Sequence, residues 1–179
     1  MKVQYFSLLA LVAALSVPAA ASLMVLDFYT VTNPTASVQT YTYSMLLMGE
    51  FLDTPNTILG AVTSQVIDGG FNGATLGALS GGSIYTATID GVAVETLQDN
   101  VAIVAPAAGV QSLTSSFIEF ENYTPVTEKI GVDLTFTLTP GDTAQIMARF
   151  DVIPFIPEPA TVGLFVLGGL ALVARRRIA

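Results

Sequence analysis

The side chains that could do chemistry are few, because the chain contains neither histidine nor cysteine. Without them, hydrolase chemistry of the Ser-His or Cys-His type is disfavoured and thiolate zinc sites are excluded. Carboxylates remain as acid and base, as in glycosidases. No pair stands out among the 14 acidic residues, and Glu119 and Glu121, two apart on one strand face, are typical of a solvated edge. We therefore expect no catalytic activity and no cofactor.

The loop VIDGGFNGATLG holds the best candidate for a metal site. Asp68 and Asn72 could give oxygen ligands to Ca²⁺, which binds six to eight of them. However, the loop lacks EF-hand or repeat-type calcium spacing, and Asp, Asn and Gly are equally the residues of an ordinary β-turn. The sequence favours a turn and keeps calcium as an alternative.

Tyrosine is the residue type through which the chain could bind sugar. β-Sandwiches can stack aromatic rings on a glycan, and Tyr29, Tyr41, Tyr43 and Tyr123 could form such a platform. Tryptophan, the preferred stacking residue, is absent, and tyrosine in a sandwich is more often half-buried packing. Sugar binding is therefore also kept as an alternative.

The distribution of charge bears on the choice of partner. The whole chain has a net charge of −8, but between Ser22 and Ile156 thirteen acids face two bases, Lys129 and Arg149, which gives −11. Because this part has no basic patch to displace counterions from a phosphate backbone, nucleic acid is excluded as an expected partner.

The elements that must position these side chains are β-strands. From Ser22 to Ile156 an alternating apolar pattern recurs, and no window keeps a helical period. We predict an all-β fold of about eight to ten strands, an antiparallel β-sandwich of immunoglobulin-like or jelly-roll type. Besides two units described next, the expected strands are Leu23–Thr32, Ser37–Met48, Ile58–Ile67, Ala74–Leu79, Val101–Val104 and Leu113–Glu121.

The stretch SIYTATIDGVAVETLQD predicts a hairpin, since Asp90-Gly91 suits a two-residue type I′ turn. Pairing Ile89 with Val92 would put Ala87 opposite Val94 and Tyr85 opposite Thr96. The face with Tyr85, Ala87, Ile89, Val92 and Val94 would then point to the core, and Thr86, Thr88 and Glu95 to solvent.

A second unit, VDLTFTLTPGDTAQIMARFDV, has two alternating strands around Pro140-Gly141. A tight turn would put their apolar sets on opposite faces, which one sheet cannot bury. Two solutions stay open: a five-residue loop, 139–143, or an arch whose strands belong to facing sheets. A faint repeat also places Asn33 and Asn122 five residues after a Phe and two before a Thr, which predicts two similar corners between strands.

The N-terminus has the layout of a secretory signal peptide. Lys2 supplies the positive start, an apolar core follows to Val17, and Pro18 precedes three alanines. Small side chains at Ala19 and Ala21 predict cleavage by signal peptidase after residue 21, so residues 1–21 are expected to be removed.

The C-terminus predicts a membrane anchor. Residues 160–174 carry no charge and are apolar on all sides of a helix, as lipid requires. Pro157 and Pro159 set its start, and Arg175, Arg176 and Arg177 would hold its end on the cytoplasmic side. At roughly 22 Å this helix is short for a hydrocarbon core of roughly 30 Å, which bilayer thinning can absorb.

This tail, Pro157-Glu158-Pro159 followed by a short apolar helix and Arg175–Arg177, resembles the PEP-CTERM sorting signal. The resemblance covers about the last 23 residues, 157–179. It implies recognition of Pro157, Glu158 and Pro159 by an exosortase, a membrane-embedded cysteine protease or transpeptidase that cuts near the motif and releases or transfers the outer domain. The stretch between the ends also looks like the exported sandwich domains that carry this tail.

The expected organisation is therefore a signal peptide (1–21), a β-sandwich (22–156) and a sorting signal (157–179). We expect a protein exported through the inner membrane, anchored at its C-terminus until it is processed, and then found at the cell surface or outside the cell. The alternative function is a carbohydrate- or calcium-binding module of an exopolysaccharide layer, with exopolysaccharide as its partner.

Overall fold

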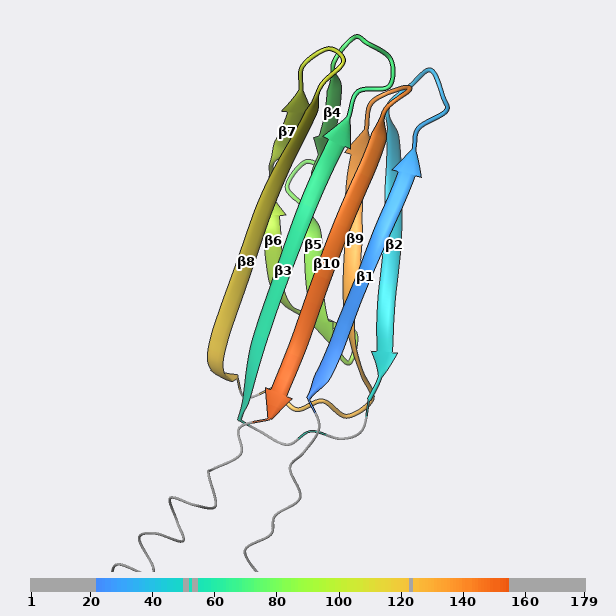
Figure 1. Ribbon diagram of the computed structural model, residues 1–179. Helices are drawn as coiled ribbons and strands as arrows, with labels where there is room; N and C mark the ends of the chain where they lie inside the picture. Colours follow the sequence, from blue (N-terminus) through green and yellow to red (C-terminus); the bar gives the residue numbers. More distant parts are fainter. Residues whose placement is uncertain (1–21, 50–51, 53–54, 123, 155–179) are drawn as a thin grey trace, which may run out of the picture. The chain divides into compact units, whose positions relative to one another are not determined.

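The computed structural model describes residues 22–49, 52, 55–122 and 124–154. The predicted signal peptide, anchor helix and sorting motif lie outside these residues. The described part is all-β, as predicted, and its strands pair in antiparallel fashion (Figure 1). The strands are β1 (Leu23–Thr32), β2 (Gln39–Met48), β3 (Asn56–Ile67), β4 (Ala74–Gly77), β5 (Ser83–Ile89), β6 (Val92–Asp99), β7 (Ala102–Ala105), β8 (Val110–Asn122), β9 (Lys129–Leu138) and β10 (Thr143–Pro154).

The strands form two sheets that face each other (Figure 1). The four-stranded sheet has the order β1-β10-β3-β8, and the six-stranded sheet has the order β6-β5-β9-β4-β7. In the second sheet β2 pairs with the whole of β9 on one side, while β5 and β4 pair with successive parts of β9 on the other. The edge strands are thus β1 and β8 in one sheet, and β2, β6 and β7 in the other.

The core lies between the sheets and follows from the alternation of side chains along each strand. Along β3 every second residue is buried from Asn56 to Val66, and β9 and β10 alternate likewise except that Gly131 and Asp151 are buried as well. Its largest fully buried side chains are Tyr85, Phe136, Phe150, Ile58, Leu76, Ile84, Ile89, Ile130, Leu134, Leu138, Ile146 and Val62. Removing such side chains from water is the main favourable term in folding, about 1.5–3 kcal/mol for each large one.

The connection between β9 and β10 is an arch, which decides between the two solutions left open by the sequence. β9 belongs to the six-stranded sheet and β10 to the four-stranded sheet. Each strand can therefore bury its own apolar set, Leu134 to Leu138 on one side and Ala144 to Val152 on the other, and the conflict of faces disappears. Gly141 takes a positive φ of 79° in this turn.

The β5–β6 hairpin forms around Asp90-Gly91, with Ile89 opposite Val92 and positive φ at both turn residues, as predicted. The predicted register beyond that pair is wrong. A bulge at Val94 places Ala87 opposite Glu95 and Tyr85 opposite Leu97. The shift has a physical reason, because a straight ladder would have directed Thr96 to the core, whereas the bulge brings apolar Leu97 there.

Two side chains of this hairpin also differ from the predicted faces. Val92 is 66% exposed rather than buried, because β6 is an edge strand and its first residue extends past the core. Thr88 is buried rather than exposed, on the side of the sheet where it contacts Gly131 of β9.

Both ends of the described chain lie at one end of the sandwich (Figure 1). Leu23, where β1 begins, pairs with Val152 near the end of β10, and Pro154 pairs with Asn56 at the start of β3. We call this the exit end. The opposite end, with the turns that follow β1 and β3 and precede β10, is called the far end.

Candidate functional site

Asp68, the first calcium candidate, braces two loops of the far end. Its Oδ1 accepts a hydrogen bond from the Gly70 amide at 3.0 Å, and its Oδ2 accepts from the amides of Gly73 at 3.0 Å and Ala108 at 2.6 Å. Partial burial works to raise the pKa of Asp68, but these amide donors outweigh it and hold the pKa below its ordinary value. Both oxygens therefore already face N–H donors from the backbone.

Asn72, the second calcium candidate, is exposed in the same loop. Among the residues that the structure describes, no group of three His, Cys, Asp or Glu side chains is arranged to hold a metal ion. Calcium at Asp68 and Asn72 stays a prediction from sequence. What the geometry shows is loop bracing, in which one carboxylate joins the β3–β4 loop to the β7–β8 turn.

A second set of contacts at the far end joins the β9–β10 arch to the β3–β4 loop, through Asp142, and to the β1–β2 corner, through Asn33. The Asp142 carboxylate bonds to the Thr139 hydroxyl and accepts from the Gly69 amide at 3.2 Å. Asn33 is fully buried, and its side-chain amide donates to the carbonyls of Ser37 and Leu138, both at 2.9 Å. These side chains fix the loops of the far end to each other.

Asn33 and Asn122 make the same local contact in the two corners that their spacing predicted to be similar. Each accepts a hydrogen bond on Oδ1 from the amide of the threonine two residues later, Thr35 at 3.0 Å and Thr124 at 2.9 Å. Each also ends an edge strand of the four-stranded sheet, β1 or β8, at the point where the chain crosses to the other sheet. The two corners are therefore alike in this contact and in following an edge strand, but Asn33 lies at the far end and Asn122 at the exit end.

Asp90 ties the β5–β6 hairpin to the segment before β9. Its Oδ2 accepts from the Thr127 amide at 2.8 Å and the Thr127 hydroxyl at 2.7 Å, while its Oδ1 accepts from the amides of Glu128 at 2.8 Å and Lys129 at 2.9 Å. Slight burial works to raise the pKa of Asp90, but these donors lower it to about 2.

The tyrosines proposed as a sugar platform pack mainly on each other. Tyr29 and Tyr43 stack with centroids 4.4 Å apart, and Tyr41 stacks on Phe136 at 5.7 Å. The rings come from β1 and β2, the edge strands that border one open side of the sandwich, and they are half-buried there. Tyr123, the fourth member, lies outside the described residues. The stacked ring faces are occupied by neighbouring rings, an arrangement that closes this side of the core.

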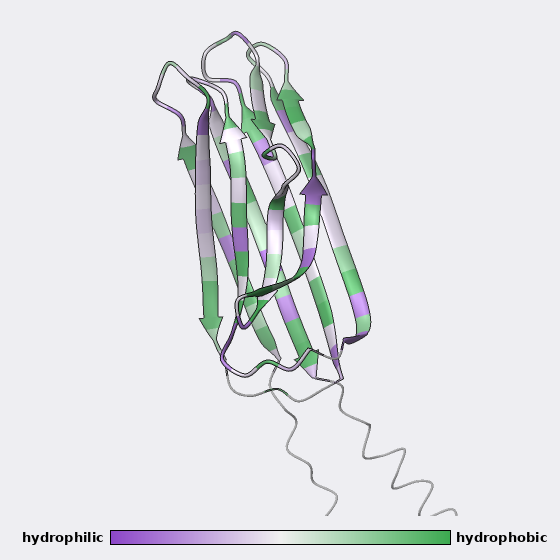
Figure 2. Ribbon diagram, turned by 180° about the vertical axis from the view of Figure 1, so that it is seen from behind, coloured by the Kyte–Doolittle hydropathy of each residue, from purple (hydrophilic) through white to green (hydrophobic). Residues whose placement is uncertain are grey.

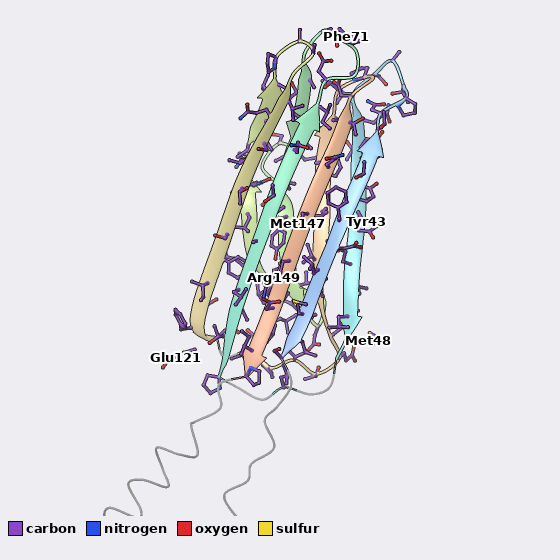
Figure 3. The ribbon with its side chains drawn as sticks, in the orientation of Figure 1. Tyr43, Met48, Phe71, Glu121, Met147 and Arg149 are labelled. Carbon is purple, nitrogen blue, oxygen red and sulfur yellow. The ribbon has the colours of Figure 1, made fainter. Side chains whose placement is uncertain are left out.

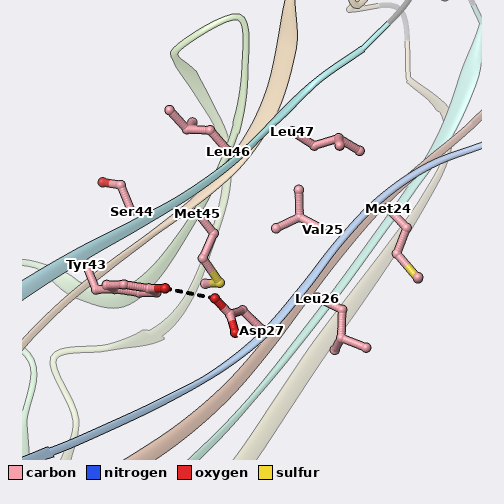
Figure 4. A pocket seen from close by; sticks show the side chains of 9 residues that line it. All are labelled: Met24, Val25, Leu26, Asp27, Tyr43, Ser44, Met45, Leu46 and Leu47. Atoms are coloured by element: carbon pink, nitrogen blue, oxygen red, sulfur yellow. Dashed lines mark hydrogen bonds between the residues drawn. The ribbon is translucent and has the colours of Figure 1, made fainter.

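A groove of about 390 Å³ lies between β1 and β2 beside these rings (Figure 4). Val25 and Met45 form its buried floor. Asp27 stands on the inward face of β1 and accepts a hydrogen bond from the Tyr43 hydroxyl at 2.8 Å, which raises the pKa of Tyr43. An inward-facing carboxylate on an edge strand hinders pairing with another chain, which protects this side of the sandwich.

The remaining acids do not form a catalytic pair in the described residues. Glu119 and Glu121 are both exposed, and Glu119 accepts only from the Asn122 side chain at 3.2 Å. Sequence reasoning missed one ion pair, in which Arg149 contacts Asp151 at 2.5 Å on the outer face of β10. Residues two apart on a strand point to the same face, so this spacing was the sequence signal that could have identified the pair.

The predicted sorting and cleavage residues, Pro157 to Pro159, Arg175 to Arg177, Ala19 and Ala21, lie outside the described part. Within that part, no helix is long and apolar enough to cross a membrane. The last described residue, Pro154, is three positions before Pro157 and is still paired in the sheet.

Residues 155–177 match the sequence model of a known family, described as the PEP-CTERM protein-sorting motif. The chain carries a PEP-CTERM sorting signal. This motif implies an exosortase as processing partner, and export with C-terminal anchoring before processing, hence a cell-surface or extracellular fate.

No curated protein matches the chain. Among solved structures, the chain is similar to the STIV MCP, with 12% identity, a TM-score of 0.40, and coverage of 72% of this chain and 48% of that one. It is also similar to the infectious bursal disease virus Gx strain, with 14% identity, a TM-score of 0.29, and coverage of 80% and 48%. The PEP-CTERM chain thus spans about half the length of the solved chains it matches.

Proposed function

We propose that this is an exported, non-catalytic β-sandwich protein of the cell surface or extracellular matrix. The signal peptide directs export, the anchor helix holds the chain with the sandwich outside, and an exosortase then cuts near Pro157–Pro159. The observation that carries the proposal is the match of residues 155–177 to the PEP-CTERM protein-sorting motif.

The geometry of the sandwich supports this course of events. The first and last strands meet at the exit end, so a signal peptide before Leu23 and an anchor after Pro154 leave the domain at the same end. Both targeting segments could then occupy one membrane while the domain folds outside it. The loops of the far end, braced by Asp68 and Asp142, lie away from this attachment.

The non-catalytic part of the proposal rests on how the acids are used. Asp68, Asp90 and Asp142 accept hydrogen bonds from loop amides or hydroxyls, and Asp151 pairs with Arg149. A carboxylate engaged in this way stabilises a loop or strand and is poorly placed to move a substrate proton.

We further infer that the sandwich is a jelly roll rather than an immunoglobulin-like domain. Support comes from the strand order, in which β1-β10-β3-β8 faces a sheet where β2 and β9 lie beside β5 and β6. The chain crosses between sheets from β1 to β2, from β2 to β3, from β3 to β4, and three more times after β7. Such repeated crossing is the arrangement of two Greek keys wrapped together.

The processing step is tested by fractionating cells that carry Pro157→Ala with Glu158→Ala. We expect the wild type to give a shortened form outside the inner membrane, and the variant to stay full-length and membrane-bound. The matched control is Pro106→Ala with Glu128→Ala, an exposed proline and an exposed carboxylate of the sandwich, which should be processed like the wild type. Equal size and equal membrane retention of wild type and motif variant would refute processing and leave permanent anchoring.

A further inference from the structure

Apolar side chains are exposed at the exit end, on the outer faces of both sheets. In the four-stranded sheet, Met24 and Ile118 lie in one row across the strands, with Phe120 and Ile153 at the next positions toward the exit end. In the six-stranded sheet, β2 ends in outward-facing Leu46 and Met48. Exposed fractions reach 72% for Met48 and 69% for Phe120, and Figure 3 shows Met48 at this end.

On the edge strands β2, β8 and β1 the outward side chains change from hydroxyl-bearing ones to large apolar ones toward the exit end. Central strand β10 instead carries outward Arg149 and Asp151 before Ile153, and the far end exposes Val38 and Phe71 in its loops. On β2 the outward residues are, in order, Thr40, Thr42, Ser44, Leu46 and Met48, and Figure 2 shows this strand turning apolar toward its end.

β8, an edge strand of the other sheet, repeats the pattern. Its outward residues start with exposed Val110 and continue with Ser112, Thr114, Ser116, Ile118 and Phe120 as the strand approaches the exit end. Two strands of different sheets therefore place three hydroxyl side chains and then two large apolar ones in the same direction. β1 agrees, with outward Thr30 near the far end and Met24 near the exit end. The large apolar side chains that end these outward rows favour a non-aqueous neighbour at the exit end.

The short segment between the last strand and the predicted anchor helix favours the membrane as that neighbour. Only residues 155–159 separate Pro154 from the predicted start of the anchor helix at residue 160. A chain extends by at most ~3.6 Å per residue, so the last strand is tethered within about 20 Å of the bilayer. A tether this short gives a high effective concentration, and weak apolar contacts suffice to hold a surface against the membrane.

We propose that the exit end is a lipid-contact surface, which rests on the proposed anchoring of the uncut chain. Met24, Leu46, Met48, Ile118, Phe120 and Ile153 enter the headgroup region of the outward-facing leaflet and set the sandwich on the membrane by this end. Glu119 and Glu121 flank Phe120 and are exposed, so the contact is apolar in origin and weaker on anionic lipid than on phosphatidylcholine.

The absence of native cysteine allows a clean test, because a single introduced cysteine is the only label site. Uncut chain is reconstituted into phosphatidylcholine vesicles with Met48→Cys or Phe120→Cys at the exit end, each carrying an environment-sensitive fluorophore. The matched control is Phe71→Cys in a far-end loop, which is 77% exposed and thus as accessible as the test positions. The quencher is a phospholipid with a nitroxide on its acyl chain.

We expect the fluorescence emission of the exit-end labels to shift to shorter wavelength and to be quenched about twofold, since interfacial side chains enter the bilayer by only about 5–10 Å. The emission of the Phe71→Cys label should remain unchanged. Replacing Ile118 and Phe120 by serine, which continues the polar pattern of β8, should reduce quenching at Met48→Cys while circular dichroism stays the same.

Three results would overturn the proposal, and they are distinguishable. Chains that fail to float with the vesicles refute the anchor and with it this contact. Chains that float but show equal quenching at both ends, or none at the exit end, refute the lipid contact alone. Energy transfer between differently labelled chains at Phe120→Cys, without lipid quenching, shows that a second copy covers this end instead.

Discussion

Replacing Asp90 by asparagine isolates the largest single carboxylate brace in the described structure. Asparagine keeps an oxygen that can accept from Glu128 and Lys129, and it tolerates the positive φ of 52° at this turn position. Its amide nitrogen cannot accept, so the amide and hydroxyl of Thr127 both lose their partner. Hydrogen bonds to a charged group contribute about 1.5–3 kcal/mol; because this site is near solvent, we expect a total loss of about 2 kcal/mol at pH 7.

The pH dependence of the stability provides a second, independent test of the Asp90 contacts. The pKa of Asp90 is lowered to about 2 from its ordinary 3.8, so the folded state binds this proton less readily than the unfolded chain does. The contribution of the Asp90 carboxylate to the free energy of unfolding is therefore present above pH 4 and is lost as the pH falls through 2. After allowing for solvent screening we expect this part to be about 1 kcal/mol, and it should be missing in Asp90→Asn.

The assay is urea unfolding of residues 22–156 of wild type and variant, at pH 7 and at steps from pH 4 to pH 2. Glu128→Gln is the control, since Glu128 is an exposed neighbouring carboxylate and such surface changes stay within about 0.5 kcal/mol. The difference in stability between wild type and Asp90→Asn should narrow as the pH falls. A variant as stable as wild type at pH 7, or a difference that is the same at pH 2, would refute the reasoning.

Three further predictions concern the core, the ion pair and the alternative ligands. Gly60→Ala should destabilise the sandwich by about 1–3 kcal/mol, because the new Cβ would come within 2.4 Å of the Phe117 ring and 2.6 Å of the Tyr85 hydroxyl; unchanged urea unfolding would contradict this packing. Arg149→Ala should lower the stability measured by urea unfolding, because it leaves the buried Asp151 carboxylate without its partner. The double variant with both residues changed to threonine should recover much of that loss; a double variant no better than the single one counts against the pairing. Calcium, or a fragment of the producing cell's exopolysaccharide, should leave the melting temperature of residues 22–156 unchanged, whereas a saturable rise would favour the binding-module alternative.

The strands were predictable where local alternation alone determined them. Leu23–Thr32 has the same bounds in the structure as in the prediction, and Asp90-Gly91 needs only its own two residues to specify a turn. The sequence could also reduce the β9–β10 connection to two solutions, because the apolar parity of Leu138 and Ala144 excluded a tight hairpin. Choosing between the two required the rest of the core.

Features that depend on distant residues were not readable in this way. The bulge at Val94 brings Leu97 and not Thr96 to the core, and the core that Leu97 contacts is built from strands distant in the sequence. Likewise, Asp68 accepts a hydrogen bond from the amide of Ala108, 40 positions away, and no local sequence pattern predicts such a contact. The sorting signal is the opposite case, since its parts are contiguous in the chain and can be identified from the sequence alone.

The intact mass of the exported protein, purified from the outside of cells, tests the central claim most directly. The account predicts a chain that begins at Ser22 and ends close to the Pro157–Pro159 motif, without the apolar segment and Arg175–Arg177. A protein recovered only from membranes, with a mass that still includes all residues to Ala179, would contradict it.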